Sequence, residues 1–229
     1  MYKMPDIELR EKIPQVYRFG KLISTKVIIK SVITGVLFIF IFLNLYFPLY
    51  AIDKYNSEAI IKDRIEKDKF FKSGDSPLKR EQRLKFKAIN YYPVTLKFVF
   101  NAKIIPFTKK DTINILTSKK NDVRKMIRYG KIEFHYKGKI YSLSAYYSLP
   151  LNEEASLFLP FGDETNGKQT YKGGRYLDID SKPGTKEIIL DFNLAYNPYC
   201  AYNNKWSCPL IPSENLLKIK IEAGEKKFK

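Results

Sequence analysis

The sequence is poor in the side chains that most often perform catalysis or bind metals. Its 229 residues include one histidine, His135, and two cysteines, Cys200 and Cys208. A zinc site needs about four ligands, mostly Cys and His, so we expect neither a metal nor another cofactor. No Gly-x-Ser-x-Gly elbow is present to hold a catalytic serine. We expect His135, which follows Ile132-Glu133-Phe134, to be an ordinary strand residue.

Other signatures of enzymes are also missing. The nearest approach to a phosphate-binding loop is Lys172-Gly173-Gly174-Arg175, which is too short and precedes no helical pattern. No alternation of strands with helices, no heptad and no internal repeat is visible. Neither a carboxylate pair nor an activated nucleophile can be located, so we lean against an enzyme and keep an enzyme of unknown reaction as an alternative.

Charge is absent from one long segment. Residues 31–51 read SVITGVLFIFIFLNLYFPLYA, with 21 uncharged positions. A helix needs about 20 apolar residues to cross a bilayer, so the segment predicts a transmembrane helix. A cleaved signal peptide fits less well, because about 30 residues precede the run and its apolar core exceeds the roughly 7–15 residues of a signal sequence.

The charges beside this segment predict its orientation. Arg18, Lys21, Lys26 and Lys30 precede it, whereas only Lys54 follows closely. By the positive-inside rule, residues 1–30 form a basic cytoplasmic segment and the C-terminal part lies outside a cell membrane that the chain crosses once. Gly35 and Asn44 interrupt the bulky face of the predicted helix. They are candidates for packing against other membrane subunits, because Gly permits close approach and Asn can hydrogen-bond.

The net charge of +17 sits mostly beyond the predicted span, because residues 52–229 carry +13. Such a surface attracts anionic lipid or acidic proteins. The alternative is a lysine-rich solvated surface, because Lys and Glu alternate without long blocks of one sign. Nucleic acid is not an expected partner.

Hydrophobic periodicity beyond the span predicts a mainly β domain. Residues 57–72 form the expected helix of a stalk over residues 52–74, and a short helix follows to about residue 86. Lys137-Gly138 is a tight-turn signal between two strands. Residues 75–229 therefore form an extracytoplasmic antiparallel β-sandwich or partly open β-barrel, with eight expected strands at residues 95–105, 112–117, 131–136, 139–147, 156–161, 175–179, 187–192 and 216–222.

Three stretches of this domain resemble a known family. They are Ser76-Pro77-Leu78, the loop from Phe161 to Tyr176, and the ending from Phe192 to Asn215. The sequence resembles family 1684 of domains of unknown function over about residues 69–228, and the predicted membrane helix lies outside the resemblance. The resemblance implies a mostly β domain and brings no activity or cofactor.

The same stretches hold the candidate ligand-binding residues. Asp163, Thr165 and Arg175 could line a polar pocket, in which the guanidinium would bind an anion. The alternative is an internal Arg–Asp pair that holds a long loop together. The remaining candidates, which could instead satisfy the backbone of an irregular ending, are Asn193, Asn197, Tyr202 and Asn203.

Cys200 and Cys208 are separated by seven residues. Outside the cytoplasm, a disulfide between them is the simple expectation. Free structural thiols and a metal site are the alternatives.

These features lead to one expected function and two alternatives. The first is an accessory subunit of a membrane complex, anchored by one helix and docking its basic β domain on partner subunits. The second is a binding module for a small anionic or apolar molecule, and the third is the enzyme mentioned above.

Overall fold

The computed structural model describes residues 55, 57–151, 156–181 and 184–228. The predicted cytoplasmic segment and membrane helix, with Gly35 and Asn44, lie outside these residues. Within the described part of the chain, no helix is both long and apolar enough to cross a membrane. The chain divides into two compact units, residues 1–54 and Tyr55–Lys229, and only the second is described below.

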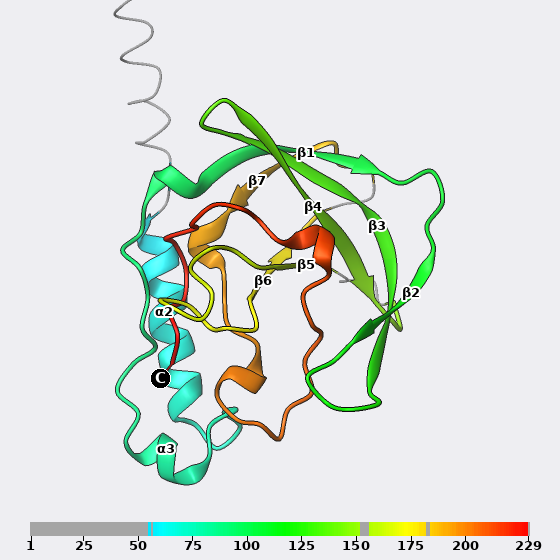
Figure 1. Ribbon diagram of the computed structural model, residues 1–229. Coiled ribbons are helices and arrows are strands. Elements are labelled where there is room, and N and C mark those ends of the chain that lie inside the picture. Colours follow the sequence, from blue (N-terminus) through cyan, green and yellow to red (C-terminus); the bar gives the residue numbers. More distant parts are fainter. Residues whose placement is uncertain (1–54, 56, 152–155, 182–183, 229) are drawn as a thin grey trace, which may run out of the picture. The chain divides into compact units, whose positions relative to one another are not determined.

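The second unit is built on one antiparallel sheet, which curls around its core as a half-barrel (Figure 1). The predicted mainly β, partly open barrel is therefore confirmed, and the strands of the described residues belong to one sheet rather than to two stacked sheets. In the described residues the sheet has seven strands, ordered β6-β5-β4-β3-β1-β7, with β2 paired to β3. The strands are β1 (Val99–Pro106), β2 (Thr112–Leu116), β3 (Val123–Tyr136), β4 (Lys139–Ser148), β5 (Leu157–Phe161), β6 (Arg175–Ile179) and β7 (Glu187–Asp191).

The predicted hairpin is confirmed. Lys137 and Gly138 both have positive φ, 49° and 72°, and Tyr136 pairs with Lys139. Two successive residues of positive φ give the backbone twist that a two-residue hairpin requires. His135 pairs with Ile140 and is exposed, as expected of a strand residue.

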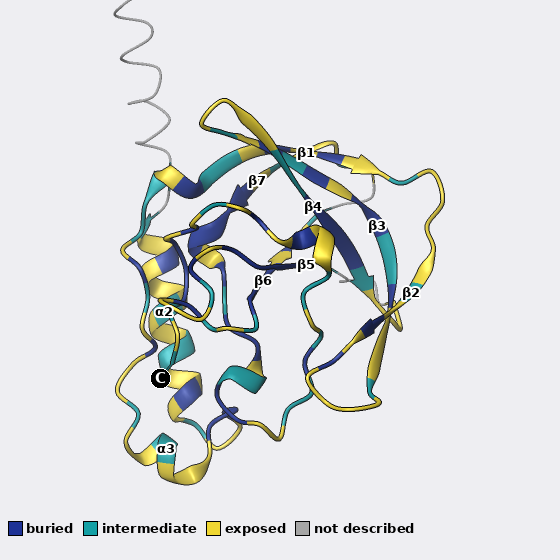
Figure 2. Cartoon of the chain, in the orientation of Figure 1, coloured by how far each residue is buried: buried dark blue, intermediate teal, exposed yellow. Residues whose placement is uncertain are grey.

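Buried residues follow one another along the strands of the curled sheet and form the main core (Figure 2). Side chains alternate across a strand, so every second residue of β3 to β6 points inward. The fully buried side chains there include Ile132, Phe134, Leu143, Leu157, Leu159, Phe161 and Phe192. Aromatic rings in this core meet edge to face, as at Phe161 and Phe192, whose centroids are 5.0 Å apart.

Helix α2 (Ser57–Lys72) has the predicted bounds, but it is not a separate stalk. Phe71 on α2 is completely buried and packs with Leu78, Ile89 and Tyr202. The ammonium of Lys67 lies 2.6 Å from Oε1 of the buried Glu225. The folded unit therefore begins at Tyr55 rather than at residue 75, and α2 is part of it (Figure 1).

Three other elements differ from expectation. Strand β3 begins at Val123, eight residues before the predicted strand over residues 131–136. The second helix, α3 (Arg80–Leu84), is shorter than predicted. The strand expected over residues 216–222 does not form, although its Leu217 and Ile221 are buried. Its backbone instead bonds to a loop: the Leu217 N–H donates to the Gly162 carbonyl at 2.8 Å. The Ile221 N–H donates to the Asp163 carboxylate at 2.7 Å. This side-chain acceptor takes the place of the carbonyl that a neighbouring strand would supply in a sheet.

Candidate functional site

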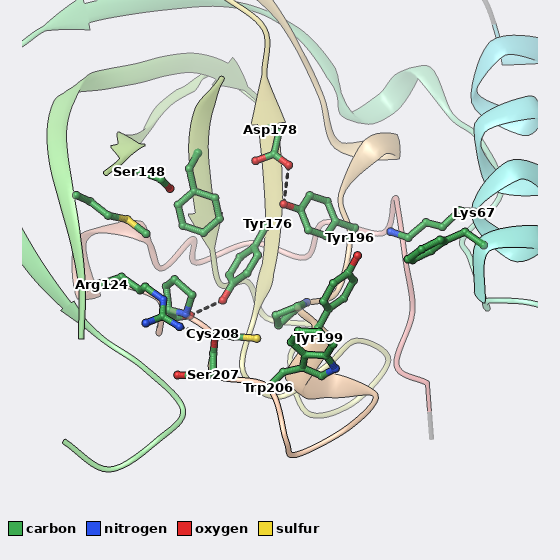
Figure 3. Close-up of a pocket in the computed structure, with 15 residues that line it drawn as sticks. Lys67, Arg124, Ser148, Tyr176, Asp178, Tyr196, Tyr199, Trp206, Ser207 and Cys208 are labelled. Atoms are coloured by element: carbon green, nitrogen blue, oxygen red, sulfur yellow. Dashed lines mark hydrogen bonds between the residues drawn. The ribbon is translucent and has the colours of Figure 1, made fainter. Parts of the chain in front are cut away.

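A cavity of about 580 Å³ opens on the face of the sheet opposite the main core (Figure 3). Its sheet wall consists of Met126 on β3, Ser148 on β4, Phe158 on β5, and Tyr176 and Asp178 on β6. On β5 and β6 the alternate residues Leu157, Leu159 and Leu177 belong to the main core, so Phe158, Tyr176 and Asp178 face the cavity. We call this cavity the aromatic pocket.

The facing wall comes from the irregular segment 196–209 and from α2. Tyr199 and Trp206 lie together there, with ring centroids 5.2 Å apart. The Trp206 indole N–H donates to the Pro77 carbonyl at 3.4 Å, which fixes the ring on the chain that follows α2. Phe70 and Lys67 of α2 complete this side. The pocket thus lies among three parts of the chain that are distant in sequence.

Tyrosine rings connect the two walls. Tyr176 meets Phe158 edge to face at 4.7 Å and Tyr196 at 5.8 Å. The Tyr176 hydroxyl donates to the Pro209 carbonyl. Burial raises the pKa of Tyr176 and of Tyr196, so both phenols stay neutral donors at physiological pH. The walls of the pocket are therefore apolar over most of their surface.

The charged groups of the pocket are mostly paired. Lys67 contacts Glu225 as described, and Arg124 Nη1 lies 3.1 Å from Oδ1 of Asp122. Asp178 accepts a 2.6 Å hydrogen bond from the Tyr196 hydroxyl. Desolvation by the surrounding protein raises the pKa of Asp178 above its ordinary value, even though the residue is exposed at the mouth of the pocket. Asp178 is thus a polar group of the pocket, and the charge of Lys67 partly offsets the rise in its pKa.

The first group of predicted ligand-binding residues lies elsewhere, in a buried network. Arg175 Nη2 contacts Asp163 Oδ2 at 3.1 Å and donates to the Ile221 carbonyl at 2.8 Å. Nη1 of Arg175 donates to the Ala223 carbonyl. Thr165 donates to the other oxygen of Asp163 at 2.6 Å. The structure thus brings the three residues together. Arg175 and Asp163 form the internal ion pair of the alternative interpretation, Thr165 supports Asp163, and the guanidinium contacts protein atoms.

The second group satisfies backbone and buried groups. The Asn193 amide donates to the Thr95 carbonyl at 2.7 Å, and the Asn197 amide donates to the Lys226 carbonyl at 2.8 Å. The Tyr202 hydroxyl donates to Glu225 at 2.6 Å. Asn203 accepts from the backbone N–H two residues further on. None of these four residues lines the aromatic pocket.

Cys200 and Cys208 are neighbours, and both are free thiols in this structure. The Cys200 backbone N–H donates to the Cys208 Sγ at 3.2 Å. The predicted disulfide is not formed here.

The residues that line the pocket were not predicted as a site, although one feature of the sequence indicated part of its wall. Leu157–Phe161 contains no polar side chain, which is typical of a strand covered on both faces.

Comparisons with known proteins place this fold in a family. The chain resembles the solution NMR structure of an uncharacterized protein from Haloarcula marismortui, with 32% sequence identity and a TM-score of 0.60. That match covers 74% of this chain and 92% of the other. No curated protein matches the chain. Residues 84–226 match the family described as Protein of unknown function (DUF1684), which confirms the resemblance in the sequence and leaves the N-terminal region outside it. The chain belongs to the DUF1684 family.

Proposed function

We propose that the folded unit is a binding module for a small organic molecule with an apolar, partly aromatic body. The observation that carries this proposal is the aromatic pocket itself. Its volume of about 580 Å³ lies within the roughly 300–1,000 Å³ typical of ligand sites. Aromatic walls with a few polar groups are the usual composition of such sites. Asp178, Tyr196 and the exposed Ser148 supply those polar groups.

The pairing of the cations favours an apolar ligand over an anionic one. Lys67 and Arg124 each face a carboxylate within 3.1 Å. An anionic ligand would have to compete with Glu225 or Asp122 for them. Asp178 would also repel an anion. The anionic molecule of the original alternative is therefore the less favoured ligand.

The single tryptophan of the chain makes this proposal testable. Trp206 lines the pocket, so its fluorescence reports on occupancy. Two probes with the same rings are compared: neutral N-phenylnaphthylamine and its sulfonate, anilinonaphthalenesulfonate. We expect saturable energy transfer from Trp206 to the neutral probe, and at least tenfold weaker binding of the sulfonate. Tighter binding of the sulfonate would support the anionic ligand instead.

Two matched variants show whether the probe occupies this pocket. Ser148→Phe places a ring inside the pocket from the end of β4, and we expect it to weaken binding at least tenfold. Ser142→Phe is the control, because Ser142 lies on the same strand outside the pocket. Equal binding by both variants, or no binding by the original chain, would contradict the proposal.

We also propose that the module is held at a membrane as an accessory subunit of a complex. The uncharged segment 31–51 supports this proposal, because it ends just before the folded unit begins at Tyr55. The +13 charge of residues 52–229 suits anionic lipid or acidic subunits.

The full chain should resist alkaline extraction from membranes, whereas residues 55–229 should be released. Gly35→Leu with Asn44→Leu should reduce recovery of partner subunits in mild detergent without releasing the chain. Purification of a lone monomer would contradict the subunit role.

A further inference from the structure

The two thiols are held in place by separate parts of the fold. Cys208 is buried, and its backbone N–H donates to the Ser118 Oγ at 3.2 Å. The Ser118 N–H in turn donates to the Cys208 carbonyl at 2.8 Å. Cys200 belongs to the short 3-10 turn Tyr199–Ala201 and bonds to Cys208 through its own amide. The sulfur atoms therefore stay neighbours without a covalent bond.

Cys200 has the surroundings of a reactive thiol. Its side chain is partly exposed, and the Tyr171 hydroxyl lies 3.8 Å from its Sγ. A hydrogen bond from the Cys208 thiol, aided by the one from Tyr171, lowers the pKa of Cys200 to about 6. The same hydrogen bond, together with burial, raises the pKa of Cys208. Cys200 is therefore the thiolate at neutral pH and Cys208 the protonated partner, which is the usual division between an attacking and a resolving cysteine.

We propose that Cys200 and Cys208 form a redox-active thiol pair that reduces hydroperoxides. The Cys200 thiolate attacks the terminal peroxide oxygen and breaks the O–O bond. The thiol becomes a sulfenic acid, and the leaving alkoxide or hydroxide takes up a proton. The Cys208 sulfur then attacks the Cys200 sulfur, and the hydroxyl leaves with the Cys208 proton as water. The two thiols lose two electrons in total, the peroxide gains them, and a small external thiol restores the pair.

This inference rests on the thiol pair and not on the ligand proposed above. It nevertheless connects to the aromatic pocket, because residues 200–208 form the loop that carries Trp206, Ser207 and Cys208 in the pocket wall. A disulfide would close this loop covalently beside Trp206. Disulfide formation should therefore change the Trp206 fluorescence, which provides an optical record of the reaction.

The test uses the full reduced chain with hydrogen peroxide as the oxidant. Intact mass should show loss of two hydrogens in the original chain, reversed by a small thiol. Cys208→Ser should stop at the sulfenic acid, which dimedone traps on Cys200. Cys200→Ser should form neither product, and unchanged near-ultraviolet circular dichroism shows that each variant is folded. Tyr171→Phe should slow the first step several-fold at neutral pH.

Three results would overturn the inference. In the Cys200→Ser variant, dimedone could trap a sulfenic acid on Cys208 as fast as it traps one on Cys200 in Cys208→Ser. That result would overturn the assignment of Cys200 as the attacking cysteine and Cys208 as the resolving one. Absence of any reaction in the folded, reduced chain would remove the activity. A disulfide already present in the purified chain, and resistant to small thiols in the folded state, would make the pair purely structural.

Discussion

The guanidinium of Arg175 and the carboxylate of Asp163 lie 3.1 Å apart, and neither side chain has solvent-exposed surface. The pair joins β6 to the loop after β5 and, through the carbonyls of Ile221 and Ala223, to the C-terminal ending. Removal of one partner from a buried ion pair leaves an uncompensated charge. Asp163→Ala should therefore lower the free energy of unfolding by about 3–5 kcal/mol, measured by chemical denaturation.

Glu164→Ala is the matched control for this variant. Glu164 is the next residue and is exposed, so its substitution should change stability by less than about 0.5 kcal/mol. Equal effects of the two substitutions would show that the Arg175–Asp163 pair does not hold the ending in place.

The contact between Lys67 and Glu225 predicts that α2 is part of the domain in solution. Lys67→Ala leaves the buried Glu225 without its ammonium, although Tyr202 still donates to it. Because Lys67 is partly exposed, the loss should be moderate, about 1–3 kcal/mol. Lys62→Ala, on the exposed face of the same helix, should have little effect. Amide hydrogen exchange over residues 57–72 is the second measurement, and rapid exchange in the original chain would identify a free stalk.

Asp178 predicts a pH dependence of stability. Its pKa in the folded chain is raised above the ordinary value, so the folded state binds this proton more tightly than the unfolded state. The free energy of unfolding therefore decreases as the pH rises from about 4 through the pKa of Asp178 in the folded chain. Asp178→Asn should remove that decline and should gain stability relative to the original chain toward neutral pH. Urea denaturation across this range measures the difference, and a constant difference at every pH would contradict it.

Cys200 predicts a pH dependence of alkylation. Only the thiolate reacts, so the rate of reaction with iodoacetamide should rise through a midpoint near pH 6, the pKa of Cys200 in the folded chain. Cys208→Ala removes the main hydrogen-bond donor and should move the midpoint up, toward the ordinary value of 9.0. Tyr171→Phe should produce a smaller upward shift. A midpoint unchanged in both variants would show that neither group stabilises the thiolate.

Local patterns in the sequence were sufficient to predict several elements of the fold. Residues 57–72 form a helix with the predicted bounds, and Lys137-Gly138 forms the predicted turn. Each of these features depends on interactions between near neighbours in the chain. The strand expected over residues 216–222 shows the limit of such patterns. Its buried alternation is real, but its hydrogen-bond partners are Gly162 and Asp163, more than fifty residues away.

The candidate site was predictable only in part. The grouping of Asp163 and Arg175 followed from their place in one loop, whereas their burial depends on the C-terminal ending that covers them. The aromatic pocket could not be assembled from sequence, because Phe158, Tyr199 and Lys67 come from a strand, an irregular segment and a helix. The absence of polar residues in β5 indicated only that its second face is covered.

The sequence by itself determined the family, the mainly β character and the presence of one long uncharged segment, because composition and short-range periodicity encode them. The tertiary structure decided that α2 packs against the domain, that Arg175 faces protein atoms, and that a pocket lies opposite the core. Each of these outcomes depends on which distant side chains become neighbours when the sheet curls. That proximity is a property of the folded chain, and no local pattern of residues contains it.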